Sequence, residues 1–263
     1  MLNFLHSFHH QAILFSLGNI HIYWYGLFIV LAILAAMFVA FSLAKPYSLK
    51  NDLIFDLAFW LIILGIIGAR LYDVVLELPY YLHYPSQIIK IWQGGLSIHG
   101  AILAGLIFII FFSRYHKISG WKLTAIIAPG LALGQAIGRW GNYFNQELFG
   151  LPTDGRWGIP IDIVNRPLDY LNYQYFQPTF IYESLGCLII FLLLFFLNKY
   201  YIAKNKLSAY FFVWMTALYM ILYSILRFSL EFIKINPTPS LFNLRWPQII
   251  SLLLIFKSSI IQK

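Results

Sequence analysis

A long apolar stretch, IYWYGLFIVLAILAAMFVAFSLA at residues 22–44, decides the fold because it contains no charged side chain. A helix that crosses a membrane needs about 20 consecutive residues that are predominantly apolar. Further uncharged runs lie at residues 57–69, 91–113, 123–138, 184–198, 207–226 and, more weakly, 246–256. Some of these runs reach the length of a span only by admitting charges at their ends. The sequence therefore predicts an all-α, polytopic membrane protein with about seven transmembrane helices.

The composition of the whole chain agrees with this interpretation. Of its 263 residues, 60% are hydrophobic and 11% are charged, which is typical of integral membrane proteins. We interpret residues 1–263 as one integral-membrane domain. The first twenty residues have neither a basic start nor a small-residue cleavage site, so we expect no cleavable signal peptide.

The positive charges are unevenly distributed along the chain. The net charge is +8, but ten of the 18 basic residues lie in alternate segments between the apolar runs or after the last run, accompanied there only by the acidic residues Asp52 and Asp56. These ten are Lys45, Lys50, Arg114, Lys117, Lys122, Lys199, Lys204, Lys206, Lys257 and Lys263. The positive-inside rule then places the N-terminus outside and the C-terminus in the cytoplasm. This distribution indicates membrane topology and not binding to nucleic acid.

The longest connection, residues 143–182, lies on the side that this topology assigns to the outside. It is rich in Tyr, Asn, Gln, Pro and Asp, and the pairs Asp154-Gly155 and Gln177-Pro178 are turn signals. Connections longer than about 12–15 residues are often lids or binding elements. We expect a small external head that meets a substrate presented from outside.

Five polar residues fall at a similar predicted depth. Along regular helices, each is 15 to 21 residues from a cytoplasmic lysine or arginine, which at 1.5 Å per residue is about 22–32 Å. They are Tyr25, Arg70, His99, Arg139 and Arg227. Because the hydrocarbon core is about 30 Å thick, we expect all five near the outer interface. Arginines that merely seek the interface would give the same pattern, and this alternative stays open.

Two of these residues belong to polar motifs suited to phosphate. Arg139 lies in GRWGNYFNQE, residues 138–147, directly after an apolar run. Arg227 and Glu231 stand four residues apart on one face of a predicted helix, in the order that is less favourable for helix stability. Arginine can hold phosphate through two parallel hydrogen bonds, so the pair of arginines is expected to bind a phospholipid head group. A snorkelling arginine and a structural ion pair are the competing interpretations.

The histidines and the cysteine point to different roles. His99 lies in GGLSIHG, residues 94–100, where glycines permit a close backbone approach or a break in the helix. An imidazole in an apolar run needs a partner, so a functional histidine and a satisfied core histidine both explain it. His6, His9 and His10 cluster without acidic or cysteine companions, and we expect no metal site there. Cys187, inside an apolar run, is expected to be a small core residue.

The chain resembles the prolipoprotein diacylglyceryl transferase family over nearly its whole length. The resemblance rests on several motifs in family order: HIYWYG at residues 21–26, GAR at 68–70, GGLSIHG at 94–100, the segment 138–150, PTFIYE at 178–183 and RFSLE at 227–231. Three positions depart from the family pattern. Ala101 stands where a second glycine is expected, Gln177 where histidine is usual, and Pro247 where a small residue is usual, so that Pro247 is expected to shift the start of the last helix.

The resemblance implies a lipid transferase of the bacterial cytoplasmic (inner) membrane, with its active site near the outer leaflet. Its partners would be phosphatidylglycerol and the lipobox cysteine of a prolipoprotein, and its products a thioether and glycerol phosphate. The implied catalytic residues are His99, Arg139 and Arg227. The implied substrate-binding residues are Tyr25, Arg70, Arg139, Asn142, Glu147, Gly150, Arg227 and Glu231.

The implied reaction requires no metal or organic cofactor. A thiolate attacks a glyceryl carbon while a phosphate ester leaves, and Arg139 and Arg227 would stabilise the growing negative charge. A free thiol has a pKa of about 8.5, so a base such as His99 would help at neutral pH. Whether His99 takes the proton or orients the lipid stays open. A transporter or flippase is the alternative from another class, because several helices with intramembrane charges also suit a conduction path.

Overall fold

The computed structural model describes residues 2–8, 11–18, 20–235, 238–241 and 244–261. The chain divides into two compact units. The first unit consists of residues 1–40 and 127–263, and the second unit consists of residues 41–126. Tyr25, Arg139 and Arg227 therefore belong to the first unit, whereas Arg70 and His99 belong to the second.

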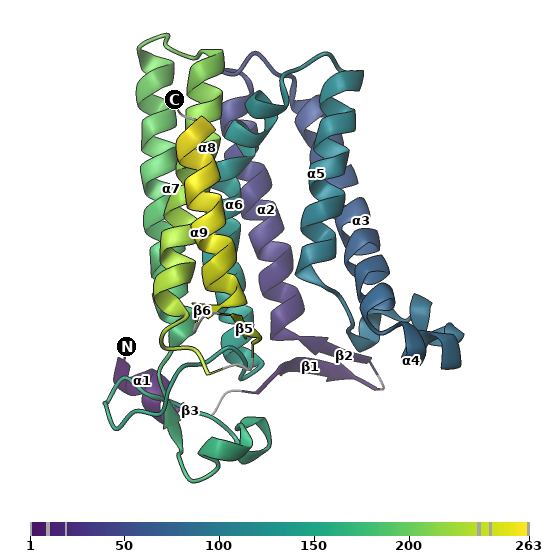
Figure 1. Ribbon diagram of the computed structural model, residues 1–263, viewed down its shortest axis with the longest axis vertical. Helices are drawn as coiled ribbons and strands as arrows, with labels where there is room; N and C mark the ends of the chain where they lie inside the picture. The colour runs from purple at the N-terminus through teal and green to yellow at the C-terminus, as the bar shows by residue number, and fades with distance from the viewer. Residues whose placement is uncertain (1, 9–10, 19, 236–237, 242–243, 262–263) are drawn as a thin grey trace. The chain divides into compact units, whose positions relative to one another are not determined.

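Most of the described chain is helical (Figure 1). The helices of 16 or more described residues are α2 Trp24–Ala44, α3 Asn51–Leu76, α5 Ile98–Tyr115, α6 Gly120–Phe144, α7 Thr179–Ala203, α8 Ala209–Leu230 and α9 Trp246–Ile261. Five of these, α2, α3, α5, α7 and α8, are long and apolar enough to cross a membrane. Each predicted apolar run overlaps one of the long helices, and the prediction of a polytopic membrane protein is confirmed.

Short strands correct the all-α prediction to a mostly helical fold. The described strands form three antiparallel pairs, β1 Ile13–Leu17 with β2 Ile20–Tyr23, β3 Ile159–Pro160 with β4 Tyr175–Phe176, and β5 Ser240–Leu241 with β6 Leu244–Arg245. The remaining helices are α1 Leu2–Ser7, α4 Leu78–His83 and the 3-10 turns Pro85–Ile89, Ile91–Gln93, Ile163–Asn165 and Leu168–Tyr170. The strands arise where the chain leaves the long helices, since backbone groups there still need hydrogen-bond partners.

In the second unit, α3 and α5 pack against each other through glycines. A Cβ atom at Gly100 would collide with the carbonyl oxygen of Gly68, and one at Gly68 would lie 2.7 Å from the carbonyl oxygen of Gly100. The uncharged run 91–113 is not one helix, because α5 begins only at Ile98. Gly94 and Gly95 take φ angles of +96° and +71°, which lie outside the helical region and are accessible mainly to glycine.

In the first unit, α8 packs against both α7 and α9. Small residues also bring α6 close to α2, where a Cβ atom at Gly130 would lie 2.7 Å from the carbonyl oxygen of Ala36. The Ser184 hydroxyl of α7 donates a hydrogen bond to the carbonyl oxygen of Ala136 in α6 at 2.7 Å.

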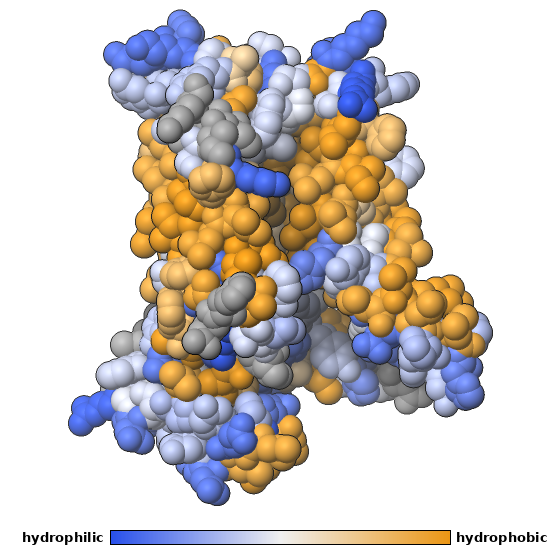
Figure 2. Space-filling view, in the orientation of Figure 1, coloured by the Kyte–Doolittle hydropathy of each residue, from blue (hydrophilic) through white to orange (hydrophobic). Residues whose placement is uncertain are grey.

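Figure 2 shows hydrophobic side chains along the helices and hydrophilic ones gathered toward their ends, as expected for helices in lipid.

The start of α9 follows from local capping. The backbone N–H of Arg245 donates to Oε1 of Gln248 at 3.0 Å, which is one half of a capping box. Pro247 is the second residue of the helix, where its missing N–H costs nothing. The helix therefore begins next to Pro247, at Trp246.

The connection between α6 and α7 has a small hydrophobic core of its own. The core combines residues from this connection with the adjoining helix ends and α1, namely Leu5, Tyr143, Phe149, Ile159, Ile161, Phe176 and Phe180. His6 of α1 stacks on Tyr175 with ring centroids 4.0 Å apart, and its Nδ1 donates to the carbonyl oxygen of Gly158 at 2.8 Å. This packing holds the end of α6 next to the start of α7, and residues near both of these helix ends contribute to the candidate site.

Candidate active site

A buried carboxylate, Glu183 in the second turn of α7, lies among three cations. Its side chain is only 1% exposed. Oε1 pairs with Nη2 of Arg139 at 2.6 Å, and Oε2 pairs with Nζ of Lys234 at 2.9 Å and with Nη1 of Arg227 at 3.5 Å. A charge this deeply buried is tolerated only when it is paired. Glu183 therefore ties together α6, α8 and the segment after α8.

A second carboxylate, Glu231, caps the C-terminal end of α8. Its Oε2 pairs with Nη2 of Arg227 at 3.3 Å, and its Oε1 pairs with Nη1 of Arg245 at 3.4 Å. Nη1 of Arg245 also donates to the carbonyl oxygen of Lys234 at 2.6 Å. Arg227 and Glu231, which the sequence placed on one helix face, do form the ion pair that was the competing interpretation, and this pair is part of a larger network.

We call these six residues the charge cluster: Arg139, Glu183, Arg227, Glu231, Lys234 and Arg245. It contains four cations and two carboxylates, so its formal charge is +2 when all six are ionised. The carboxylates are nearly inaccessible, whereas the side chains of Arg139 and Arg227 are each 21% exposed. The accessible side of the cluster is therefore positive, as a site for a phosphate group requires.

A chain of hydrogen bonds extends from Arg139 along the end of α6. Nη1 of Arg139 donates to Oδ1 of Asn142 at 3.1 Å, and Nδ2 of Asn142 donates to Oε1 of Glu147 at 2.7 Å. The buried carboxamide of Asn142 therefore links Glu147 to Arg139, so that the position of Glu147 helps to orient the guanidinium group of Arg139. The structure brings together the three residues that the sequence motif placed near each other.

Tyr25 and Gly150, two further predicted site residues, contact the same region by packing. The Tyr25 ring lies against Gly141 of α6, where an added Cβ atom would be 2.8 Å from Cδ2 of the ring. Gly150 forms a β-bridge with Lys234, and an added Cβ atom there would lie 2.9 Å from the carbonyl oxygen of Ile233. Gly150 therefore allows the close backbone approach that sets the position of Lys234.

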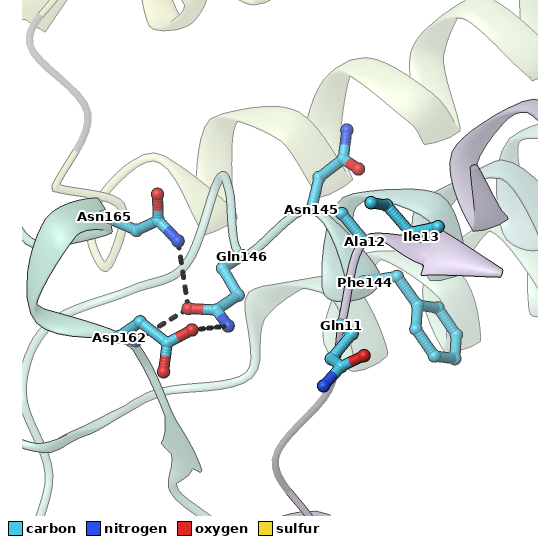
Figure 3. A pocket seen from close by; sticks show the side chains of 8 residues that line it. All are labelled: Gln11, Ala12, Ile13, Phe144, Asn145, Gln146, Asp162 and Asn165. Carbon is cyan, nitrogen blue, oxygen red and sulfur yellow. Dashed lines mark hydrogen bonds between the residues drawn. The ribbon is translucent and has the colours of Figure 1, made fainter. Parts of the chain in front are cut away.

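A separate cavity of about 350 Å³ lies beyond the end of α6 (Figure 3). Its lining residues come from the start of β1 and the two residues before it, the end of α6 and the connection to α7, and are Gln11, Ala12, Ile13, Phe144, Asn145, Gln146, Asp162 and Asn165. Gln146, with a φ angle of +52°, closes the helix end. Its Oε1 accepts from the backbone N–H of Asp162 at 2.7 Å, and its Nε2 donates to Oδ2 of the same residue at 2.7 Å. No member of the charge cluster lines this cavity.

The second unit carries the other two predicted site residues. His99 is the second residue of α5 and is exposed, with its ring centroid 6.1 Å from that of Tyr72. It is therefore not a satisfied core histidine within this unit. Arg70, in α3, is buried, and all of its hydrogen-bond partners among the described residues are groups of the same unit.

Three members of the charge cluster, Glu183, Lys234 and Arg245, were not among the predicted site residues. Glu183 directly precedes the uncharged run 184–198, and a carboxylate at the edge of a span is itself a functional signal. Lys234 is 5% exposed. Burial lowers the pKa of its ammonium group below the ordinary value, while the negative charge of Glu183 acts in the opposite direction. Lys234 lacked a distinguishing sequence signal, because its burial depends on the chain turning back after α8.

The remaining histidines and the cysteine have simpler environments. His6 is engaged with Gly158 and Tyr175, whereas His9 and His10 lie outside the described residues, so the expectation of no metal site there stays a prediction. Cys187 is fully buried in α7, which confirms that it is a core residue.

Comparison with known proteins identifies the family. A family model for prolipoprotein diacylglyceryl transferase matches residues 12–262. A phosphatidylglycerol–prolipoprotein diacylglyceryl transferase from Synechocystis sp. is 40% identical over 246 residues, which are 92% of this chain and 85% of that protein. The enzyme of the same name from Synechococcus elongatus is 43% identical over 92% of this chain and 83% of its own length. The chain therefore belongs to the prolipoprotein diacylglyceryl transferase family, and it is a multi-pass membrane transferase.

Proposed function

We propose that this chain transfers the diacylglyceryl group of phosphatidylglycerol to the thiol of a lipobox cysteine in a prolipoprotein. The sulfur forms a thioether bond to the glyceryl carbon while the bond from that carbon to the phosphate ester oxygen breaks. Glycerol phosphate leaves with the bonding electrons, and a base receives the thiol proton. Family membership and the names of the relatives support this pair of substrates.

The charge cluster is the observation that best supports this chemistry. Its formal charge of +2 is concentrated on the accessible side, where Arg139 and Arg227 are each 21% exposed. Both arginines bind the phosphodiester and stabilise the negative charge that develops on the leaving oxygen. Glu183 and Glu231 hold them in place beforehand, so little reorganisation is needed during the reaction.

The supporting residues act through these two arginines. Asn142 and Glu147 orient Arg139 through their hydrogen bonds, and Glu231 orients Arg227 through its ion pair. Tyr25 packs against α6 beside this network, and Gly150 sets the position of Lys234. A one-ångström error in such positioning costs roughly 100-fold in rate, so these residues influence turnover even where they do not touch the lipid.

His99 supplies the base in this proposal. It lies in the first turn of α5 and is exposed, so its imidazole is accessible to a substrate. A neutral imidazole accepts the thiol proton and generates the nucleophilic thiolate. The alternative role, orientation of the lipid head group, predicts a different dependence on pH.

We further propose that residues 1–263 act as one integral-membrane domain with about seven spans in the bacterial cytoplasmic membrane. The N-terminus and the head at residues 143–182 lie outside, the C-terminus lies in the cytoplasm, and the active site lies near the outer leaflet. The lysine-rich connections between α2 and α3, between α5 and α6 and between α7 and α8 support this orientation.

Cysteine labelling tests the orientation in intact cells. A membrane-impermeant maleimide should label the variant Asp154→Cys, whereas Asn205→Cys should be labelled only after the membrane is opened. The native Cys187 is fully buried, so the unmodified protein serves as the background control. The reverse labelling pattern would invert the topology and contradict the proposal.

Reconstitution tests the reaction itself. Purified protein is incubated with phosphatidylglycerol vesicles and a lipobox peptide, and the peptide mass and the released glycerol phosphate are measured together. We expect equal amounts of diacylglyceryl peptide and glycerol phosphate, and no adduct on a peptide in which serine replaces the cysteine. Absence of the adduct under conditions where a relative is active would contradict the proposal.

A further inference from the structure

Arg70 makes an unusual set of contacts for a charged residue in an apolar helix. It lies in α3 and is only 7% exposed. Its Nε donates to the carbonyl oxygen of Ile88 at 2.9 Å, and its Nη2 donates to that of Gln87 at 2.7 Å. Its Nη1 contacts the carbonyl oxygens of Gly94 at 2.8 Å and Gly95 at 2.7 Å. Each guanidinium nitrogen therefore holds the backbone of residues 87–95.

A tyrosine and a carboxylate complete the surroundings of Arg70. Nη1 of Arg70 also donates to the hydroxyl of Tyr81 at 2.9 Å, and that hydroxyl donates to Oδ2 of Asp73 at 2.8 Å. The distance from Nη1 of Arg70 to Oδ2 of Asp73 is 3.7 Å. Arginine has five N–H groups, and these contacts use nearly all of them. Little capacity remains for a ligand.

The backbone that Arg70 holds is shaped to receive it. Gly95 takes a φ angle of +71°, and an added Cβ atom there would collide with Nη1 of Arg70. Two residues later, the backbone N–H of Ser97 donates to the carbonyl oxygen of Ala69, the neighbour of Arg70, at 3.1 Å. The segment is therefore attached to α3 at successive points up to the start of α5.

His99 follows this anchored segment immediately. Ser97 is the N-cap of α5, and His99 is the second residue of the helix. On the other side of His99, Gly100 packs directly against Gly68 and Tyr72 of α3. The backbone of His99 thus lies between two fixed points, the Arg70 contacts before it and the glycine contact after it.

We propose that Arg70 is a positioning residue for His99, acting through the segment 87–97, and not a ligand of the lipid phosphate. This inference rests on the proposed role of His99 in the transfer reaction. A lysine at position 70 keeps the charge but offers a single ammonium group in place of a planar fork. This ammonium group cannot hold the carbonyl groups of residues 87, 88, 94 and 95 at once. The first turn of α5, which carries His99, then shifts relative to α3.

Kinetics of the variant Arg70→Lys test this proposal. We expect kcat to fall by about 100-fold, as for a catalytic group displaced by an ångström, with the KM for phosphatidylglycerol within about twofold of wild type. The matched control is Lys90→Gln, which removes a positive charge from the same segment and should leave both constants unchanged. A raised KM with an unchanged kcat would overturn the proposal, because it would identify Arg70 as a lipid ligand.

A double-mutant cycle and a chemical probe separate this proposal from the reaction mechanism. If Arg70 acts through His99, then Arg70→Lys adds little to the loss already caused by His99→Gln, whereas independent roles give multiplicative losses and would overturn it.

Modification of His99 by diethyl pyrocarbonate, followed by peptide mass spectrometry, is a measurement that does not require an active enzyme. We expect its rate to change in Arg70→Lys and not in Lys90→Gln, even if the proposed transfer reaction is wrong; equal rates in all three proteins would overturn the proposal.

Discussion

Arg70 and Arg139 each directly follow an apolar run of the sequence and share a similar predicted depth, yet their environments differ. Arg70 is 7% exposed, and its guanidinium group donates hydrogen bonds to backbone carbonyl groups and to the hydroxyl of a tyrosine. Arg139 is 21% exposed and shares the buried carboxylate of Glu183 with two further cations. An arginine saturated by carbonyl groups fixes a fold, whereas arginines that outnumber their carboxylates leave positive charge for a ligand. Partners, and not depth alone, distinguish the two roles.

The largest effect is expected from Glu183→Gln, which removes the carboxylate that three cations share. Breaking a buried ion pair in this way costs about 3–5 kcal/mol of stability. Because two phosphate-binding arginines lose their orientation together, we expect turnover to fall by on the order of 10³ or more. Turnover and the thermal unfolding midpoint should be measured together, with Asp169→Asn, an exposed head residue, as control. Near-normal turnover in Glu183→Gln would remove the charge cluster from the mechanism.

The next largest effect is expected from Arg139→Lys, which keeps the charge and loses the planar fork. Loss of one such donor typically lowers kcat by about 10²–10³. The matched control is Arg166→Lys in the same unit. Arg166 donates to the carbonyl oxygens of Ile161 and Leu171 and does not belong to the charge cluster. The transfer activity of Arg166→Lys should therefore remain close to that of wild type. The two variants should be compared at equal amounts of folded protein. Equal losses of transfer activity would contradict the distinction between an arginine that binds the ligand and one that only holds backbone carbonyl groups.

A smaller and pH-dependent effect is expected from His99→Gln. Glutamine can donate and accept hydrogen bonds but cannot serve as a base, so the loss at pH 7 should be about 10². The loss should shrink as the pH rises toward the thiol pKa of about 8.5, since the peptide then ionises without help. Wild type and variant should be compared from pH 6.5 to 9.5, with lipid binding measured separately. A pH-independent deficit with weakened lipid binding would assign His99 to the head group instead.

Much of the helical framework was predictable because a span needs a long apolar run. The runs in residues 22–44 and 207–226 correspond closely to α2 and α8. The run 91–113 was misleading, because apolar composition does not record that Gly94 and Gly95 turn the chain before α5 begins. The short strand pairs escaped prediction because each depends on few residues and on where the long helices end.

The site was predictable where its members share a helix. Arg227 with Glu231, and Arg139 with Asn142, are neighbours in sequence as well as in space. Glu183 was missed because its three partners come from different parts of the chain, and only the packing of α6, α7 and α8 brings them together. For the same reason, the contacts of Arg70 with residues 87–95 were not readable from spacing.

Binding of phosphatidylglycerol to wild type and two variants tests the central claim most directly. Wild type, Arg227→Gln and Arg70→Lys, each reconstituted in nanodiscs, should be titrated with labelled phosphatidylglycerol and their Kd values compared. A lost charge-assisted hydrogen bond is worth about 1.5–3 kcal/mol, so we predict that Arg227→Gln binds the lipid at least about tenfold more weakly. Arg70→Lys should bind it as wild type does. Normal binding by Arg227→Gln together with weakened binding by Arg70→Lys would contradict the account.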